Sequence, residues 1–251
     1  MDFGIGGRRA AVAGASAGLG LASARALAVE GVRVAICGRD RDRIEAAAAT
    51  LAAEGADVVP VVADVSTVAG AEGFVAEATE ALGGLDILVP NAGGPPPGTF
   101  ATTPVEAYLP AVELNLLSTV AMCKAAVPAM VERGWGRVVA ITSVSVRQPL
   151  PQLILSNTAR AGVTGFLKTL ALEVAPHGVT VNSVQPGTHA TDRMGLLYGG
   201  DLSAAAALQP TGTVGEPDDF GATVAFLASE RAKFVTGVAL PVDGGAYRGL
   251  Q

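Results

Sequence analysis

The stretch AAVAGASAGLG, residues 10–20, places three glycines between a short apolar run and an Ala-rich segment with helical spacing. Each glycine has a physical role in such a turn. Gly14 permits a sharp exit from a strand, Gly18 lets backbone amides approach a pyrophosphate, and Gly20 allows close packing of a helix on a sheet. An ordinary tight turn is the alternative in a glycine-rich chain, but the position directly after the first strand favours a dinucleotide-binding turn.

Short β-branched runs and Ala-rich helical stretches alternate along the rest of the chain. The runs that we expect to be strands cover residues 10–14, 32–37, 57–64, 86–90, 137–142, 179–184 and 238–242. The stretches that we expect to be helical cover residues 18–30, 41–54, 67–82, 105–133, 153–176 and 216–229. Most of the strand runs lack strict alternation, which is typical of parallel strands buried on both faces. The pattern predicts an α/β fold with a doubly wound, mainly parallel seven-stranded sheet, and residues 1–251 form one domain because no linker or repeat interrupts it.

The composition excludes several classes of function. Half of the 251 residues are hydrophobic, which supplies a substantial core and argues against a disordered chain. A net charge of −6 argues against nucleic-acid binding, which depends on clustered Lys and Arg. Cys37 and Cys123 have no CxxC partner, so we predict no metal or disulfide site and a cytoplasmic location. The N-terminus lacks a signal pattern, and no run of about 18 uninterrupted apolar residues favours a membrane span.

Two side chains at strand ends bear on the choice of cofactor. Arg39 follows the second strand, where a carboxylate would bind the adenosine ribose and an arginine suits a 2′-phosphate. It therefore favours NADP(H) over NAD(H), although a solvated arginine at the start of a helix is the alternative. Asp64 ends the third strand and could accept a hydrogen bond from the adenine amino group; the alternative is a plain helix cap near Ser66.

Residues 187–214 form the least regular segment of the chain. They contain Met194, Leu196, Leu197 and Tyr198 among glycines. One interpretation is an active-site lid whose apolar residues face a substrate. The other is a surface loop with a short packed helix, and the sequence favours neither.

Several motifs occur in an order that resembles the short-chain dehydrogenase/reductase family over essentially the whole chain. They are the glycine turn, Asn91-Ala92-Gly93, Asn115, Ser143, Pro186-Gly187 with Thr191, and Val242-Asp243-Gly244-Gly245. The resemblance implies a Rossmann domain with strand order 3-2-1-4-5-6-7 and a homodimer or homotetramer. Together with the chemical arguments for individual side chains, it predicts cofactor contacts at Gly14, Ser16, Ala17, Gly18, Leu19, Arg39, Asp64, Val65, Asn91, Ala92, Gly93, Arg160, Pro186, Gly187, Thr188 and Thr191.

The sequence departs from this family at its working pair, Tyr-x-x-x-Lys. Thirteen positions beyond Ser143, the chain has Ser156 and, four residues later, Arg160. A tyrosine of pKa about 10 can deliver a proton when a nearby lysine lowers its pKa. A serine hydroxyl is a much weaker acid, and an arginine stays charged and cannot relay protons. Ser143, Ser156 and Asn115 could still polarise a substrate oxygen, and Arg160 could hold the nicotinamide ribose.

Other residues could supply the missing acid. His189 follows the Pro186-Gly187 motif and is the best replacement by type, although a lone loop histidine is more often a surface residue. Tyr108 and Tyr198 are better explained as packing aromatics.

The leading hypothesis is an atypical NADP(H)-dependent oxidoreductase that acts on a small or medium, partly apolar carbonyl substrate or its alcohol. The first alternative is a non-redox enzyme on the same scaffold, such as an isomerase, cyclase or dehydratase. The second is a catalytically silent NADP-binding protein, because function depends on the site and this site lacks its usual acid.

Overall fold

The computed structural model describes residues 2–197 and 199–250 and contains one parallel sheet. Its strands are β1 (Arg9–Val12), β2 (Arg33–Gly38), β3 (Val58–Val62), β4 (Ile87–Val89), β5 (Gly136–Ile141), β6 (Val179–Pro186) and β7 (Ala239–Val242). They lie in the order β3-β2-β1-β4-β5-β6-β7, and the neighbouring strands pair in parallel. The predicted fold class, a seven-stranded doubly wound sheet, is confirmed.

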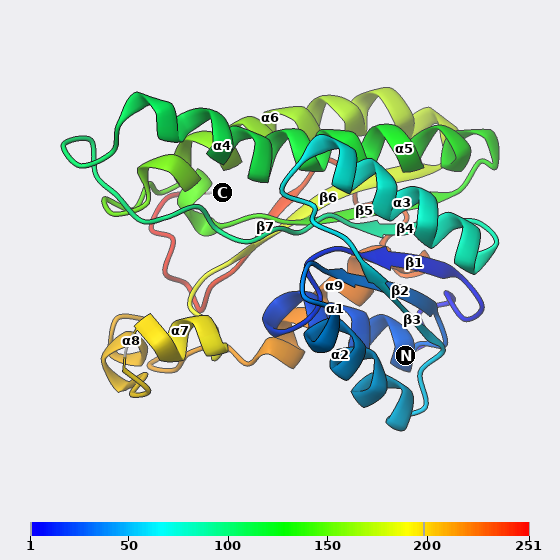
Figure 1. The fold of residues 1–251 in the computed structure, drawn as a ribbon, viewed down its shortest axis with the longest axis horizontal. Coiled ribbons are helices and arrows are strands. Elements are labelled where there is room, and N and C mark those ends of the chain that lie inside the picture. Colours follow the sequence, from blue (N-terminus) through cyan, green and yellow to red (C-terminus); the bar gives the residue numbers. More distant parts are fainter. Residues whose placement is uncertain (1, 198, 251) are drawn as a thin grey trace.

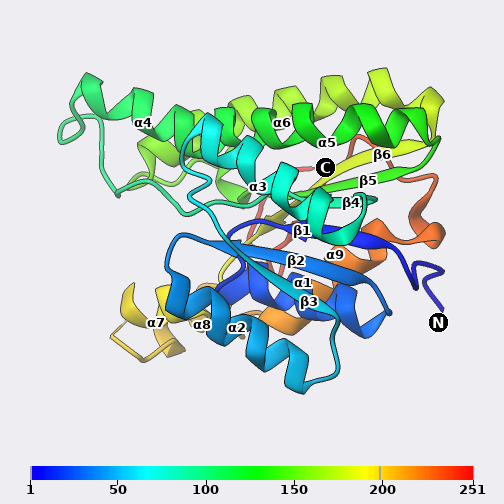
Figure 2. The ribbon, with the colours of Figure 1, turned by 45° about the vertical axis from the view of Figure 1, so that its right-hand side comes forward.

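Helices cover both faces of the sheet (Figure 1). The longer ones are α1 (Gly18–Val29), α2 (Arg41–Ala53), α3 (Val68–Leu82), α5 (Ser118–Glu132), α6 (Ile154–Val174) and α9 (Pro217–Ala228). One core cluster joins the sheet to α3, α5 and α6, and the other joins it to α1, α2 and α9. The two helical layers remain on opposite sides of the sheet when the molecule is turned (Figure 2).

The crevice of the sheet lies at β1. This strand pairs with β2 on one side and with β4 on the other, so the chain winds outward in both directions from it. Doubly wound folds bind their ligands at the carboxyl ends of the strands that flank such a switch point. The glycine turn, which follows β1, therefore lies where a ligand is expected.

The helix expected over residues 105–133 is divided in the structure. A short turn (Val105–Ala107) leads into α4 (Tyr108–Val112), then a π-helical turn covers Glu113–Leu117, and α5 completes the run. By length and composition this one stretch could cross a membrane, but half of its apolar window is buried inside the fold, as in a core helix. Turns of π type occur often at functional sites, and this one carries Asn115.

The irregular segment at 187–214 carries two short helices, α7 (Asp192–Leu197) and α8 (Ser203–Ala207). They extend beyond the carboxyl ends of the strands, on the side of α1 and α9 (Figure 1). Tyr198 lies outside the described residues. The segment thus has a short helix, as the surface-loop interpretation expected, and the location beside the strand ends that the lid interpretation requires.

Candidate functional site

The glycine turn has the geometry that a bound phosphate needs. Gly14 and Gly18 have φ of +56° and +58°, a left-handed region that favours glycine. A Cβ on Gly20 would lie 2.4 Å from the carbonyl oxygen of Gly14, so no side chain fits there. Ala17, at the N-cap of α1, provides no side-chain cap, which leaves amide groups of the first turn for a ligand. The turn therefore fits a dinucleotide pyrophosphate.

Asn91 holds this turn from the neighbouring strand. It follows β4, and its Nδ2 donates hydrogen bonds to the carbonyl oxygens of Ala13 and Gly14, at 3.2 and 3.1 Å. A Cβ on Gly14 would lie only 3.0 Å from the same Nδ2. Asn91 thus braces the turn, and Ala92 and Gly93 continue from it along the crevice.

The adenosine end of the crevice combines a hydroxyl with a positive charge. Arg39 is exposed at the end of β2, and a Cβ on Gly38 would lie 3.2 Å from the Cβ of Ser16. The Oδ1 of Asp64 accepts a hydrogen bond from the Ser66 amide at 3.0 Å, but the N-cap of α3 is Thr67, so Asp64 closes a turn before the helix and does not cap it. Hydrogen bonds from Ser66, together with the nearby charge of Arg39, lower the pKa of Asp64. The carboxylate is therefore ionised and turned partly toward its own backbone.

A second wall of the crevice comes from the end of β6. A Cβ on Gly187 would lie 2.7 Å from the Cα of Asp243, so only glycine fits after Pro186. The Cγ2 of Thr191 faces the glycine turn, 3.5 Å from the position of a Cβ on Gly18. A cavity of about 460 Å³ opens between the glycine turn with the first turns of α1 on one side and Thr191 with the start of α9 on the other. Its lining includes Ser16, Ala17, Gly18, Thr191, Asp192 and Glu216.

The two serines of the expected catalytic set come from separate elements. Ser143 follows β5, and its Oγ accepts a hydrogen bond from the Ser145 amide at 3.1 Å, so its own O–H can still donate. Ser156 lies on the first turns of α6 and is 7 % exposed. No hydrogen bond to the Ser156 hydroxyl occurs in the described part of the chain. Both are therefore able to donate to a substrate oxygen.

Arg160 ties two loops of the site together. Its Nη1 donates to the carbonyl oxygens of Ile141 and Thr142 at 3.2 and 3.3 Å, and its Nη2 donates to that of Ala92 at 3.4 Å. The guanidinium thus joins the end of β5 to the loop after β4. Sequence reasoning gave Arg160 a role toward the cofactor ribose and missed these backbone partners.

Asn115 also contacts backbone. Its Nδ2 donates to the carbonyl oxygen of Gly93 at 2.9 Å, while its Oδ1 is buried without a partner among the described residues. One N–H of the amide that was expected to polarise a substrate oxygen is thus engaged in holding the loop after β4. The amide has a second N–H, whereas the buried Oδ1 can only accept.

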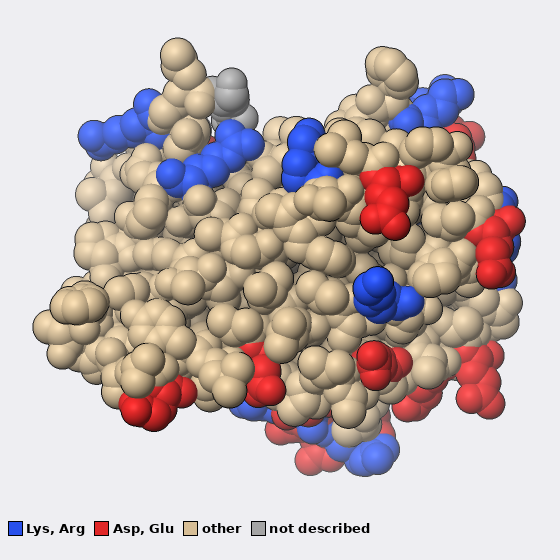
Figure 3. Space-filling view, turned by 90° about the horizontal axis from the view of Figure 1, so that it is seen from above, with Lys and Arg blue, Asp and Glu red and all other residues tan. Residues whose placement is uncertain are grey.

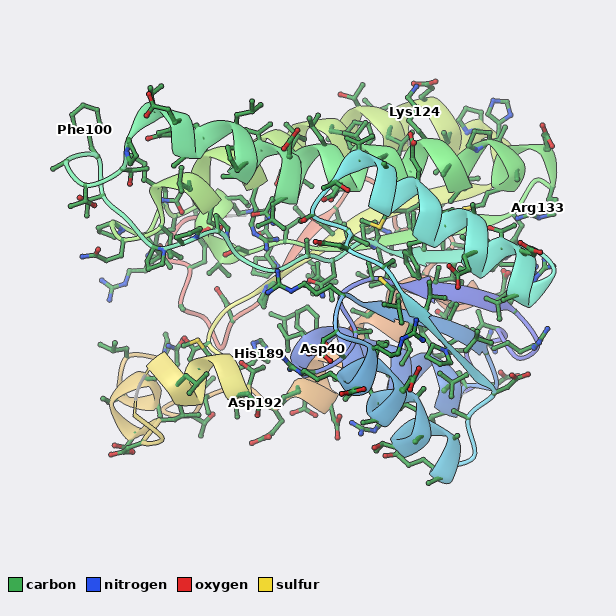
Figure 4. The ribbon with its side chains drawn as sticks, in the orientation of Figure 1. Asp40, Phe100, Lys124, Arg133, His189 and Asp192 are labelled. Atoms are coloured by element: carbon green, nitrogen blue, oxygen red, sulfur yellow. The ribbon has the colours of Figure 1, made fainter. Side chains whose placement is uncertain are left out.

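His189 lies in the core. The side chain is 3 % exposed, so the surface interpretation is wrong, and its ring packs edge-on against Phe220 of α9 with centroids 5.2 Å apart. Figure 4 places it near the start of α7, between the sheet and the α7–α8 segment. Burial lowers the pKa of His189, although the Gly187 carbonyl and three nearby carboxylates oppose this shift. Its neutral form is therefore favoured.

An apolar cavity was not expected from the sequence. It measures about 390 Å³ and lies between the loop after β4 and α4. Leu114 and Leu155, the residues immediately before Asn115 and Ser156, contribute to its wall. The other lining residues are Pro95, Pro96, Pro97, Thr102, Thr103, Pro104, Ala107, Pro110 and Ala111. The run Pro95-Pro96-Pro97 is the one sequence signal that this wall carries.

Comparisons with known proteins agree with this geometry. A family model described as Enoyl-(Acyl carrier protein) reductase matches residues 14–247. The chain is 37 % identical over 251 residues to an L-rhamnose 1-dehydrogenase (NAD(P)(+)) of Azotobacter vinelandii, covering 96 % of each. It is 35 % identical over 240 residues to human dehydrogenase/reductase SDR family member 4, covering 94 % of this chain and 86 % of that protein.

Similarity to solved structures extends over the full length. L-sorbose reductase from Gluconobacter frateurii, solved with NADPH and L-sorbose, superposes with a TM-score of 0.93 at 33 % identity and covers 100 % of both chains. These relatives are oxidoreductases, and the matched region includes the glycine turn and the strand ends described above. The chain belongs to the short-chain dehydrogenase/reductase family.

Proposed function

We propose that the protein is an NADP(H)-dependent oxidoreductase with a non-standard active site, acting on a carbonyl compound or its alcohol. The observation that carries this proposal is the uncapped N-terminus of α1, built on Gly14 and Gly18 and faced by Thr191. When bound there, the nicotinamide supplies hydride transfer to or from carbon. The oxidoreductase relatives support the same reaction type.

The preference for NADP(H) rests on the end of β2. Arg39 is exposed directly after β2, Ser16 lies close to Gly38 at the same strand end, and the next carboxylate, Asp40, caps α2 by accepting a hydrogen bond from the Arg43 amide. An arginine and a hydroxyl are suitable partners for a 2′-phosphate. A cofactor with this phosphate should therefore bind more tightly than one without it.

This preference can be tested by titrating NADPH and NADH into the wild-type protein and into Arg39→Ala. We expect the substitution to weaken NADPH binding by about tenfold, which is the equivalent of one charge-assisted contact. The affinity for NADH should stay nearly unchanged. Lys124→Ala is the charge-matched control, because Lys124 lies on α5, away from β2 (Figure 4). Equal weakening of both cofactors would contradict the proposed role of Arg39.

Ser143 and Ser156 would bind the reacting oxygen. Both hydroxyls can donate, and neither is acidic enough to replace a phenol as the proton source. Arg160 adds a permanent positive charge beside them, which favours negative charge on that oxygen. Water would supply the proton, and Asn115 would maintain the position of the loop after β4.

The missing relay can be tested by restoring it. Carbonyl reduction should appear or rise in the double variant Ser156→Tyr with Arg160→Lys if the proton relay alone limits turnover. Cofactor oxidation across a panel of ketones, quinones and imines provides the measurement, with circular dichroism to confirm folding. A folded double variant with no gain would count against this account.

The substrate is expected to be small and partly apolar. The cavity of about 390 Å³ next to Leu114 and Leu155 has the size of a small-molecule site. Prolines in its wall have no N–H to offer, so a polar ligand would find few donors there. Ketones with an apolar substituent should accordingly be turned over better than their hydroxylated analogues.

The same titration separates the alternatives. Tight NADPH binding with no turnover of any panel member would favour a silent NADP-binding protein. Failure to bind either cofactor would favour a non-redox enzyme. We also propose a cytoplasmic location, because Cys37 and Cys123 are both free, buried thiols, which suits a reducing compartment.

A further inference from the structure

The two ends of the 187–214 segment are fastened to each other. The amide of Ala190 donates to the carbonyl oxygen of Gly215 at 2.8 Å, and the amide of Gly215 donates to that of Thr188 at 2.9 Å. These bonds form a parallel bridge between His189 and Gly215. Residues 190–214 therefore leave the core and return to it at one point.

The imidazole of His189 occupies that point. On one side it packs against Phe220, which is completely buried in α9. On the other side lies Gly215, where a Cβ would be 2.7 Å from Cδ2 and 2.8 Å from Nε2 of the ring. Nδ1 donates to the carbonyl oxygen of Gly187 at 3.3 Å. The ring is thus held between α9 and the returning strand of the segment.

Gly215 is required here by the ring and not by the backbone. Its φ lies outside the positive region where glycine is favoured, so an alanine could adopt the same conformation. The three atoms nearest to the position of such a methyl group all belong to His189. Replacing this glycine should therefore displace the imidazole with little strain elsewhere.

Contacts lead from this ring to the glycine turn. α9 packs closely on α1, since a Cβ on Gly221 would lie 2.4 Å from the carbonyl oxygen of Ala22. The same α1 begins at Gly18, which Thr191 faces from the segment. A shift of His189 against α9 would consequently move Thr191 relative to the turn.

We propose that His189 is a positioning residue that pins both ends of the 190–214 segment to α9 and thereby sets Thr191 against the glycine turn. The expected effect on cofactor binding rests on the proposed function. The expected effect on the segment itself does not, because it follows from the packing alone.

The test compares Gly215→Ala, His189→Ala and the double variant with the wild-type protein. Gly73→Ala on α3 is the matched control, because a Cβ there meets nothing within 4 Å. The rate of limited proteolysis without cofactor measures how often residues 190–214 detach from the core and become accessible to cleavage. NADPH titration measures the effect on cofactor affinity at the glycine turn. Where turnover is available, KM and kcat are measured separately.

We expect Gly215→Ala to raise cleavage within the segment and to weaken NADPH, each by about tenfold, with KM rising more than kcat falls. His189→Ala should act in the same direction, because it leaves the bridge without its support. The double variant should be less impaired than the sum of the two, since removing the ring removes the clash. Gly73→Ala should behave as the wild type.

Wild-type cleavage rates and NADPH affinity in Gly215→Ala would overturn the proposal, as would full additivity in the double variant. If Gly215→Ala does not fold, His189→Ala decides: protection of the segment unchanged from wild type would overturn the pin. If the wild-type protein binds neither NADPH nor NADH, the proposed function fails, while the proteolysis still tests the pin.

Discussion

At the scale of single residues, the buried imidazole of His189 predicts a pH dependence of stability. Burial lowers its pKa below 6.5, whereas the Gly187 carbonyl and the carboxylates of Asp219, Asp243 and Glu216 oppose this shift. The unfolded chain therefore binds a proton at this side chain more readily than the folded protein. The stability contributed by the neutral ring is present above the unfolded pKa and is lost as the pH falls below it.

This dependence can be measured by urea unfolding between about pH 7.5 and about pH 5.5, where histidine titrates. The wild type should lose more free energy of unfolding over this interval than His189→Ala. Carboxylates elsewhere in the chain titrate in both proteins, so their effect on the free energy of unfolding cancels when the two proteins are compared. Identical slopes for the two proteins would show that His189 is protonated equally in both states.

Arg160 gives a second prediction at this scale. Arg160→Met keeps much of the side-chain volume and removes the donors to Ile141, Thr142 and Ala92. Loss of these bonds to partly buried carbonyls should cost about 1–3 kcal/mol of unfolding free energy. Urea unfolding provides the measurement. An unchanged free energy would mean that water replaces the guanidinium without penalty.

Individual residues also show what sequence can predict of a site. The positions of Gly14, Gly18 and Gly20 follow from steric requirements that leave a pattern in the chain. The partners of Asn115 and Arg160 are backbone carbonyls of other loops, and a carbonyl has no residue type to recognise. The geometry of the glycine turn could therefore be predicted from the sequence, but the backbone partners of Asn115 and Arg160 could not.

At the scale of elements, the loop that carries Ser143 is fastened to β7 and to the C-terminal tail. Arg147, four residues further on, donates from Nη2 to the carbonyl oxygen of Ala239 at 2.7 Å, and its guanidinium lies 5.7 Å from the ring centroid of Tyr247. The Oε1 of Gln148 accepts from the Arg248 amide at 3.2 Å. The tail thus limits the motion of the serine loop.

Arg147→Ala should lower kcat/KM by about tenfold while NADPH affinity stays near that of the wild type, because the change affects the oxygen site and not the glycine turn. Tyr247→Ala should have a smaller effect in the same direction. Tyr247→Phe is the control that keeps the aromatic face, and should be near normal. A wild-type value of kcat/KM in Arg147→Ala would show that the contacts of Arg147 have no effect on Ser143.

The elements themselves were predicted well where periodicity is strong. The seven strands and the α1, α2 and α3 helices occur close to the expected ranges. The expected helix over 105–133 is interrupted at Glu113–Leu117, because an extra residue in a helical turn has no signature of its own. The bridge between His189 and Gly215 was missed for a similar reason, since two-residue contacts carry no periodicity.

At the scale of the whole molecule, the layer formed by α4, α5 and α6 has few charges on its outer face (Figure 3). Leu109 and Leu172, on α4 and α6, are 65 % and 70 % exposed. We infer that this face contributes to the expected homodimer or homotetramer. Leu109→Glu with Leu172→Glu should then lower the mass measured by light scattering. A wild-type protein that is monomeric at micromolar concentration would contradict the inference.

The two cysteines have a practical consequence for following the 190–214 segment. Burial raises the pKa of Cys37 and of Cys123 to about 12, and both residues are buried. Thiolate is the reactive form, so native protein should resist maleimides and similar reagents. A cysteine introduced on α8 would then be the only site that takes a fluorophore or spin label. The native cysteines therefore need not be replaced before a label is attached to α8, and that label could report directly on the movement of the segment.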